Sequence, residues 1–298
     1  MGRVIRGGME RHRTILKAEV LEFLAVKAGG TYLDATFGEG GHAESILEKG
    51  GDVVGLDRDT ETLDRYRQTG EQRLNPHLRL VHGTMSGVGR NPGIPLLEGA
   101  IADLGVSTRQ ILSTDRGFSF QAPGPLDMRM DLTQTRTLAD ILGSISERDL
   151  ADALFRLGEV RSSRRIASQL LTGFHKGTIQ TTADLLPLVS FSPTNRHPAT
   201  QLFMALRMMV NEELSEIETG IPEIFEKLKP GSRLCVITFH SVEDRVVKRL
   251  FKVLSGQCIC ESSHCYCPRD KRATILTKKP MLPGDEEDTW KKCCTISS

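Results

Sequence analysis

Apolar runs alternate with helix-compatible segments over the first hundred residues. Four runs, at residues 31–34, 52–57, 78–82 and 99–103, have the length of buried strands, and three of them end in an aspartate. Such runs, separated by helices, are typical of βαβ units, in which helices cover both faces of a parallel sheet. The pattern predicts an α/β protein.

The hydrophobic pattern changes between about Ser107 and Pro198. This part contains no clear strand, and its apolar residues recur at helical spacing, in the stripes Leu138, Ile141 and Leu142, then Leu150, Leu154 and Leu157, then Ile166, Leu170 and Leu171. We therefore expect an all-helical domain at residues 110–205, inserted into a sheet domain formed by residues 1–109 and 206–298.

The sheet pattern resumes after one more helical stretch. From Leu202 to Leu228 apolar residues recur every three or four positions, which predicts one long amphipathic helix that ends at Pro230–Gly231, with Pro222 as a candidate break. The apolar run 233–239 then reads as another buried strand. A helix with apolar residues from Val242 to Leu254 is expected to follow it.

Composition places the chain among soluble globular proteins. Hydrophobic residues make up 39% and charged residues 26%, and the net charge of +1 excludes a uniformly basic nucleic-acid coat but not a local basic patch. No segment approaches the roughly 20 apolar residues that span a bilayer, and the first residues lack the apolar core of a secretory signal. We expect a cytoplasmic protein with no membrane partner.

Cysteine usage agrees with a reducing compartment. Seven cysteines are an odd number for a disulfide framework, and most of them follow residue 250. Cys258-x-Cys260 and Cys265-x-Cys267, with His264 between them, have enough thiolates for a zinc ion. The C-x-C spacing is less usual for zinc than C-x-x-C, so we expect reduced thiols and no metal.

A glycine-rich loop follows the first strand. Such a loop lets backbone amides approach a ligand at the start of the next helix. Gly38-x-Gly40-x-x-Ala43 fits the dinucleotide pattern, and Asp57 lies 19 residues after Gly38, close to the place of its ribose-binding acid. The loop therefore permits an NAD-dependent oxidoreductase, and a tight turn without a ligand is a further reading.

Three carboxylates favour S-adenosylmethionine over a dinucleotide. Asp34, Asp57 and Asp103 each end a predicted parallel strand, and these ends meet at one edge of the sheet. A ring of carboxylates suits a ligand with a sulfonium and an ammonium group and repels a pyrophosphate. Asp34 would anchor the amino-acid end of the cofactor, Asp57 would accept its ribose hydroxyls, and Asp103 would face the methyl-donor centre.

Basic residues concentrate in the middle of the predicted helical domain. The segment from Phe155 to Lys176 contains a single acid, Glu159. Its basic residues are Arg156, Arg161, Arg164, Arg165 and Lys176. A basic face of this density contacts nucleic-acid phosphates in many proteins. A solvated helix surface is the alternative reading.

Longer motifs carry a family resemblance. They are His12 with Glu19–Leu21, Leu33–His42, Leu56–Asp59, Asp103–Ser107 with Gln110, Arg116–Phe120, Gly124–Asp131, Ser163–Ala167, His197–Thr200, Ala205–Arg207 and Phe239–Arg245. With these stretches the chain resembles the bacterial 16S ribosomal RNA cytosine-N4 methyltransferases, the RsmH or MraW family, over roughly residues 12–282. The Gly-Pro-Leu-Asp-Met-Arg-Met-Asp and Phe-His-Ser-x-Glu-Asp-Arg motifs are specific to that family.

The resemblance implies a fold and a reaction. The fold is a class I, Rossmann-like S-adenosylmethionine methyltransferase sheet with a helical domain inserted after the fourth strand. The reaction is methylation of N4 of a cytosine in the decoding region of small-subunit ribosomal RNA, with free RNA or the assembled small subunit as partner. A homodimer is compatible with the sequence. The cofactor-binding residues implied by family analogy are Gly40, Gly41, His42, Asp57, Met85, Asp103 and Gln110, with Asp34 and Gly38 as weaker candidates.

The chain departs from the family pattern at several positions. Met85 stands where the family has Phe, Val160 replaces an acid, and Gln201 replaces an Arg. The tail from Gly284 onwards is acidic and cysteine-bearing instead of basic. Met85 and the tail leave a catalytically inactive RNA-binding scaffold as an alternative.

Asp103 is the candidate catalytic residue. Cytosine N4 is a poor nucleophile, so catalysis depends on holding the amine in line with the methyl group and on an acceptor for its hydrogen. Phe118, Phe120 or Phe239 could stack on the base, although each could equally be a core residue. His240 could orient the base or a phosphate, or make a structural hydrogen bond.

Two charged motifs are read as structural. Asp127, Arg129 and Asp131 alternate in sign, which favours an ion network that fixes the helical domain to the core. Arg245 is expected to pair with a neighbouring acid and not with RNA.

Overall fold

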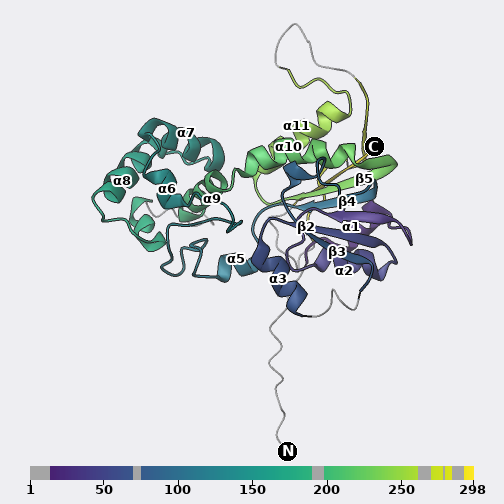
Figure 1. Cartoon of the computed structure of the whole chain (residues 1–298). Coiled ribbons are helices and arrows are strands. Elements are labelled where there is room, and N and C mark those ends of the chain that lie inside the picture. The colour runs from purple at the N-terminus through teal and green to yellow at the C-terminus, as the bar shows by residue number, and fades with distance from the viewer. Residues whose placement is uncertain (1–13, 70–74, 190–197, 261–269, 278, 284–291) are drawn as a thin grey trace, which may run out of the picture.

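The computed structural model describes residues 14–69, 75–189, 198–260, 270–277, 279–283 and 292–298. Within these residues a seven-stranded sheet carries helices on both faces, and a helical lobe lies beyond one end of it (Figure 1). The predicted α/β class is confirmed. None of the helices in this part of the chain is both long and apolar enough to cross a membrane.

Five parallel strands and two antiparallel ones make up the sheet. The parallel strands are β1 (Thr31–Asp34), β2 (Asp52–Asp57), β3 (Leu78–His82), β4 (Leu97–Asp103) and β5 (Leu228–Thr238), and the last two are β6 (Thr274–Ile275) and β7 (Lys292–Ser297). The first three coincide with the apolar runs of the sequence, whereas β4 and β5 begin earlier. The sequence analysis did not predict β6 or β7.

The strand order creates a crevice at one edge of the sheet. The order is β3-β2-β1-β4-β5-β7-β6, so the chain proceeds in one direction from β1 and in the other from β4. Tyr32 pairs with Gly99 and Asp34 with Ile101 across this junction. Ligands of open α/β sheets bind outside the carboxyl ends of the strands at such a switch point.

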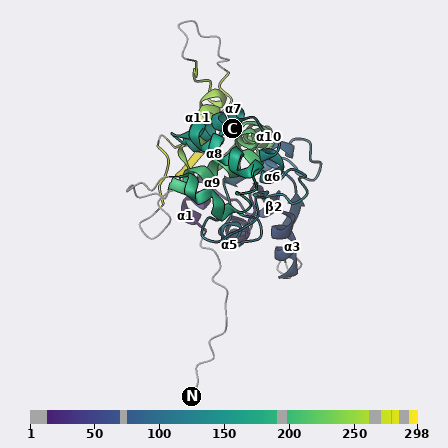
Figure 2. The ribbon, with the colours of Figure 1, turned by 90° about the vertical axis from the view of Figure 1, so that its left-hand side faces the viewer.

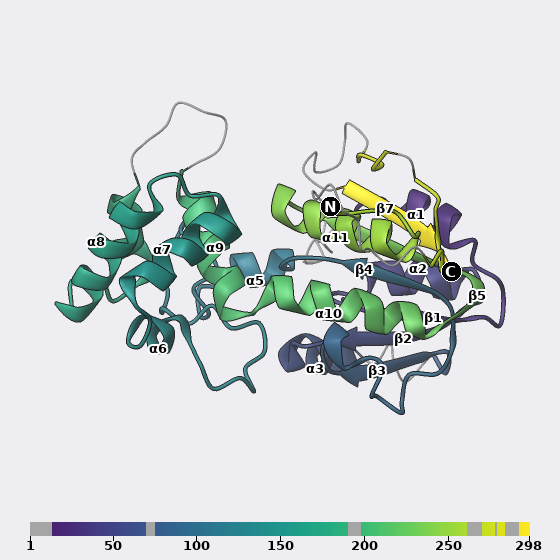
Figure 3. The same ribbon diagram turned by 90° about the horizontal axis from the view of Figure 1, so that it is seen from above.

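The helices form two layers around the sheet. On one face lie α1 (Lys17–Leu24), α2 (Gly41–Glu48) and α3 (Thr60–Gln68), and on the other lie α10 (Glu213–Glu226) and α11 (Ser241–Leu254) (Figure 3). Adjacent strand residues serve opposite layers, since Tyr32 packs with α1 and α2 whereas Leu33 packs with α10 and α11. Both faces are therefore buried, as the apolar runs require.

The helical lobe has an apolar core of its own. It comprises α6 (Leu138–Leu142), α7 (Glu147–Gly158), α8 (Ser163–His175), the 3₁₀ helix η2 (Thr182–Leu188) and α9 (Pro198–Val210). A single cluster joins their buried side chains, and it contains the predicted apolar stripes. The short helix α5 (Thr108–Leu112) leads from β4 into the lobe, which lies in front of the sheet in Figure 2.

The predicted long helix is wrong. Two helices, α9 and α10, meet at Asn211–Glu212, and Glu212 has a left-handed backbone with φ 50°. Pro222 lies inside α10 without ending it, and Pro230 and Gly231 lie in β5. The predicted domain boundary at 205/206 falls within α9, where apolar side chains on both sides of it share the lobe's core. The division into two domains stays a prediction, and the bend after Val210 is the better place for its second boundary.

A buried asparagine accounts for the position of the bend. Asn211 is fully buried, and its side-chain amide donates to the carbonyl oxygens of Met128 at 2.7 Å and Arg207 at 2.8 Å. Its side-chain oxygen accepts a hydrogen bond from the amide of Met130 at 2.7 Å. These bonds tie the bend to a segment about eighty residues earlier.

Asn211→Ala is expected to lower the free energy of unfolding by about 2–4 kcal/mol, because it leaves buried backbone groups of Met128 and Met130 without partners. Urea denaturation measures the change. Asn75→Ala, which removes one exposed hydrogen bond to His77, is the matched control and should change the free energy of unfolding by about 0.5 kcal/mol or less. Equal losses in the two variants would contradict this account of the bend.

Candidate active site

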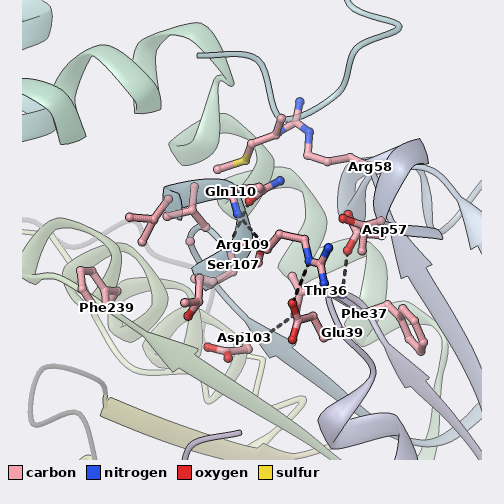
Figure 4. Close-up of a pocket in the computed structure, with 18 of the residues that line it drawn as sticks. Thr36, Phe37, Glu39, Asp57, Arg58, Asp103, Ser107, Arg109, Gln110 and Phe239 are labelled. Carbon is pink, nitrogen blue, oxygen red and sulfur yellow. Dashed lines mark hydrogen bonds and ion pairs between the residues drawn. The ribbon is translucent and has the colours of Figure 1, made fainter. Parts of the chain in front are cut away.

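A cavity of about 1300 Å³ lies outside the carboxyl ends of β1, β2 and β4, between the sheet and the helical lobe (Figure 4). Asp57, Thr36, Asp103 and Phe239 belong to four neighbouring strand ends along its floor, in the order of β2, β1, β4 and β5. Residues of α5, α9 and α10 complete the walls. The cavity is larger than the roughly 300–1000 Å³ of ordinary ligand pockets, so it has room for a cofactor and part of a substrate.

The glycine loop forms one wall in a conformation that needs glycine. Gly38 and Gly40 have positive φ values of 53° and 82°. A Cβ atom on Gly40 would lie 2.9 Å from the ring of Phe37, and one on Gly41 would lie 1.7 Å from Oγ1 of Thr14. Gly38 and Gly41 line the cavity, whereas Gly40 is not part of its lining.

Asp57 holds the glycine loop in place. Its carboxylate accepts hydrogen bonds from the amides of Gly38 at 2.8 Å and Asp59 at 2.9 Å. Burial raises the pKa of Asp57 to about 6, although both amides act against this shift. Each carboxylate oxygen keeps a further lone pair toward the cavity, so the residue can accept the two hydroxyls of a ribose.

The other two predicted acids, Asp34 and Asp103, differ in their access to the cavity. Asp34 is 1% exposed, does not line the cavity and accepts a hydrogen bond from the amide of Thr36 at 3.3 Å, so its contact with the cofactor stays a prediction. Burial raises the pKa of Asp34 to about 7, and the charges of Asp103 and Asp57 add to this. Asp103 does line the cavity, and its amide donates to Oγ1 of Thr36 at 2.6 Å, which fixes the end of β4 beside β1.

A buried cluster joins the start of the lobe to the turn after β2. Arg116 donates to both carboxylate oxygens of Asp59 at 2.8 and 3.0 Å, and Gln110 donates to Asp59 at 2.9 Å. Arg116 also pairs with Glu61 at 2.5 Å. Burial would raise the pKa of Asp59, but these partners outweigh it and hold the pKa below its ordinary value. Sequence reasoning gave Asp59 and Arg116 no role, although both lie in motifs of the family resemblance.

Gln110 is fixed at both ends of its amide. Its carbonyl oxygen accepts a hydrogen bond from the amide of Ser107 at 3.0 Å, in a capping box that starts α5, while its nitrogen binds Asp59. It lines the cavity together with the predicted residues His42 and Met85, which are both buried. Met85 packs so closely on α10 that a Cβ on Gly220 would lie 2.3 Å from its own.

Aromatic side chains from the lobe and from the end of β5 border the cavity. Phe118, Phe120 and Phe239 all line it. Phe203, which the sequence analysis did not select, lines it as well and meets Phe120 edge to face with ring centroids 5.4 Å apart. The structure therefore brings the three predicted aromatic residues to one cavity from two segments far apart in sequence.

His240 is placed in a structural role. It is buried, does not line the cavity, and caps α11, with Nδ1 accepting from the amide of Glu243 at 3.4 Å and Nε2 3.2 Å from Oε1 of Glu243. Glu243 in turn accepts from the amide of Phe239 at 2.8 Å. These contacts favour the structural hydrogen bond, and contact of His240 with a base stays a prediction.

The predicted basic face lies outside the cavity. Arg161, Arg164 and Arg165 are exposed at the start of α8 and do not line the cavity. Arg245 pairs with Glu159 at 2.7 Å, which confirms the expected ion pair.

The alternating charges of Asp127, Arg129 and Asp131 mainly form one ion pair between residues close in sequence. Arg129 binds Asp127 at 2.7 Å, and Asp131 lies 3.8 Å from His82 of β3. Asp131 thus provides the expected contact between the lobe and the core.

The cysteine pairs are described only in part. The sulfurs of Cys258 and Cys260 lie 3.1 Å apart, and Cys258 is exposed instead of packed. Cys265, Cys267 and His264 lie outside the described residues.

Comparison with known proteins decides between the readings of the glycine loop. The model of the MraW methylase family matches residues 9–294. The chain belongs to the MraW methylase family. The methylase reading is therefore correct, and the NAD-dependent oxidoreductase is excluded.

Curated relatives of this methylase match nearly the whole chain. It is 40% identical to "Ribosomal RNA small subunit methyltransferase H" of Trichlorobacter lovleyi, covering 93% of this chain and 92% of that protein. It is 37% identical to the protein of the same name from Pelobacter propionicus, covering 93% of each chain. Among solved structures, a putative methyltransferase from Streptococcus mutans in complex with SAH has a TM-score of 0.45 and 14% identity, covering 96% of this chain and 99% of that one.

The cavity fits S-adenosylmethionine, the cofactor of this methylase. The carboxylates of Asp57 and Asp103 line the sheet side, and the buried charge of Asp34 lies beneath them. Acids crowded together raise one another's pKa, and a cation between them relieves this repulsion. The donor set therefore suits a ligand with a sulfonium and an ammonium group.

Binding of S-adenosylmethionine is expected to weaken as the pH falls below about 6. Asp57 must be ionised to accept two hydroxyl hydrogen bonds, and its pKa of about 6 leaves it mostly protonated at pH 5. Affinity measured by calorimetry should fall roughly tenfold between pH 7.5 and pH 5. Asp57→Asn should bind weakly with little pH dependence, while Asp52→Asn, at the opposite end of β2, should keep the wild-type profile. A flat wild-type profile would exclude Asp57 as the ribose acceptor.

Proposed function

We propose that this methylase transfers a methyl group from S-adenosylmethionine to the exocyclic N4 of a cytosine in the decoding region of small-subunit ribosomal RNA. The curated relatives, at 36–41% identity, carry the name of a small-subunit ribosomal RNA methyltransferase. The observation that carries the proposal is the position of Asp103, between the acidic cofactor side of the cavity and its aromatic lobe side. We propose the cytoplasm as its location and the small ribosomal subunit as its partner.

Asp103 is the residue we assign to the chemistry. Bound S-adenosylmethionine would supply an electrophilic methyl group. The carboxylate of Asp103 would accept a hydrogen bond from the N4 amino group and turn its lone pair toward the methyl carbon. It would offset the positive charge that develops on nitrogen and receive the proton that N4 loses as the methyl group is transferred. Its fixed backbone, held by Thr36, supports this orientation because little reorganisation is needed during transfer.

The aromatic side chains would hold the base. A cytosine must leave its stack to reach Asp103, and flipped bases are commonly held between aromatic rings. Phe120 and Phe239 border the cavity from the lobe and from the sheet, while Phe118 is more deeply buried. These positions support stacking by Phe120 or Phe239, with Phe118 packing behind them.

The exposed arginines of α8 would bind RNA phosphates. Arg161 and Arg164 have no ion-pair partner among the described residues, and Arg165 makes only long contacts of 3.4 Å. Unpaired surface guanidinium groups can exchange counterions for phosphates. The lobe would then position the RNA while the cavity acts on one base.

Asp103→Asn is expected to lower the single-turnover rate of methylation by roughly 10²–10³ at saturating cofactor, because it keeps the shape but removes the charge. The assay uses small subunits from a strain that lacks this modification, with methylcytosine mapped by mass spectrometry. Asp115→Asn, an exposed acid outside the cavity, is the matched control. If only cofactor affinity falls, Asp103 is a binding residue; if wild type transfers no methyl group, the protein is the inactive scaffold.

Replacing Arg161, Arg164 and Arg165 by Gln is expected to weaken RNA binding and flatten its salt dependence, by a log–log slope of roughly 0.7–0.9 per lost phosphate contact. Cofactor affinity should stay unchanged. A control variant with Lys27→Gln and Lys49→Gln, two exposed lysines outside the lobe and the cavity, should keep the wild-type slope. An unaltered slope in the arginine variant would leave this face as a solvated surface.

A further inference from the structure

An arginine borders the lobe side of the cavity from helix α9. Thr200, Phe203, Met204 and Arg207 line the cavity, and their spacing of three and four residues places them on one face of that helix. Arg207 belongs to one of the motifs of the family resemblance, but nothing above has given it a role. It is 8% exposed, which is rare for an arginine unless it is paired.

One acid fixes the guanidinium of Arg207 in place. Nε and Nη2 donate to the two carboxylate oxygens of Glu213 at 2.8 and 2.9 Å. Glu213 is also buried, in the first turn of α10 just after the bend at Glu212. Burial lowers the pKa of Arg207, but the charge and hydrogen bonds of Glu213 outweigh it and raise the pKa above its ordinary value. The group is therefore charged and held in one orientation.

The remaining nitrogen of this guanidinium is available to a ligand. Nη1 has no hydrogen-bond acceptor among the described residues, although Arg207 borders the cavity. A guanidinium only donates hydrogen bonds, so a group bound against it must present acceptors. Nη1 is therefore a spare donor on a residue that borders the cavity.

The position of Arg207 indicates which ligand this is. Asp57 and Asp103 line the sheet side, where the cationic groups of the cofactor fit. Arg207 lines the cavity from helix α9, together with the aromatic side chains Phe120 and Phe203. Glu213 offsets the charge of Arg207, so its remaining hydrogen-bond donors and the neighbouring rings, and not a net charge, point to the second occupant of the cavity, which is the substrate base.

We infer that Arg207 recognises the target cytosine by donating to its N3 and O2 acceptors, an inference that rests on the proposed function. Cytosine carries these two acceptors beside the N4 amino group, so a donor there leaves N4 free to face Asp103. Uracil carries a hydrogen on N3, which meets the donors of Arg207 unfavourably. Arg207 is thereby a specificity-determining residue that excludes uracil.

The test compares binding of small subunits that carry cytosine or uracil at the target position, with S-adenosylhomocysteine present so that no methyl group is transferred. Wild type should prefer cytosine by roughly tenfold or more. Because Arg207→Met alone would leave Glu213 buried and uncompensated, the main variant combines Arg207→Met with Glu213→Gln, and Arg207→Lys is the charge-conserving variant. Both should lose the share of the preference that Arg207 supplies, a fall of several-fold, because Asp103 still favours the N4 amino group over the O4 of uracil; S-adenosylmethionine affinity should stay within about twofold of wild type.

Glu213→Gln alone loosens the orientation of Arg207 but keeps its donors, so it should lose only part of the preference, while Lys248→Gln, outside the cavity, is the control that should keep it. An unchanged preference in both Arg207 variants would overturn the inference and make the residue structural. A uniform loss of affinity for both substrates would also overturn it, because it would indicate a phosphate contact, and a loss of cofactor affinity would place Arg207 in the cofactor site. Failure of the proposed function is distinct, because wild type would then methylate no cytosine at this position.

Discussion

The ion pair between Asp59 and Arg116 joins the two halves of this molecule. Asp59 follows β2 and starts α3, whereas Arg116 comes from the chain that leaves α5 for the lobe. Both side chains are buried, so loss of Arg116 would leave the charge of Asp59 with Gln110 as its remaining side-chain donor, at a cost of about 3–5 kcal/mol. Asp57, two residues before Asp59, holds the glycine loop. The position of the lobe and the shape of the cofactor side of the cavity therefore depend on the same contact.

This coupling explains how one cavity serves two ligands. The sheet supplies carboxylates at the ends of its central strands, and α9 supplies an arginine and aromatic rings. A cationic cofactor therefore fits beside the carboxylates of the strand ends, and a base with hydrogen-bond acceptors fits beside the arginine and the rings. Asp103 lies at the boundary of the two regions, where methyl transfer has to take place.

The residues expected to bind the cofactor of a methylase lie where the fold would place a ligand. The glycine loop, Asp57 and Asp103 meet at the switch point of the strand order, where α/β sheets bind ligands. Asp34 ends β1 as its position in sequence implied, but it is buried, and burial raises its pKa to about 7, so it is more readily protonated than an ordinary aspartate.

The sequence by itself determined the elements whose signals are local. The strands 31–34, 52–57 and 78–82 and the helices of the lobe follow from apolar periodicity, because burial of one or both faces imposes that period. The acids at the strand ends could also be predicted from the sequence, because parallel strands bring their carboxyl ends to one edge of the sheet. The motifs of the family resemblance added Gln110, which no local pattern would have selected.

Only the tertiary structure decided features that depend on distant partners. The bend at Asn211 arises from bonds to Met128 and Met130, and a local reading therefore favoured Pro222 as the break. Strand β7 was missed because its pairing with β5 joins segments about sixty residues apart. The pairing of Arg207 with Glu213 is close in sequence, but its meaning depends on the cavity beside it. Tertiary packing decides which atoms of a charged side chain contact the protein and which are left for a ligand. Sequence patterns do not encode this.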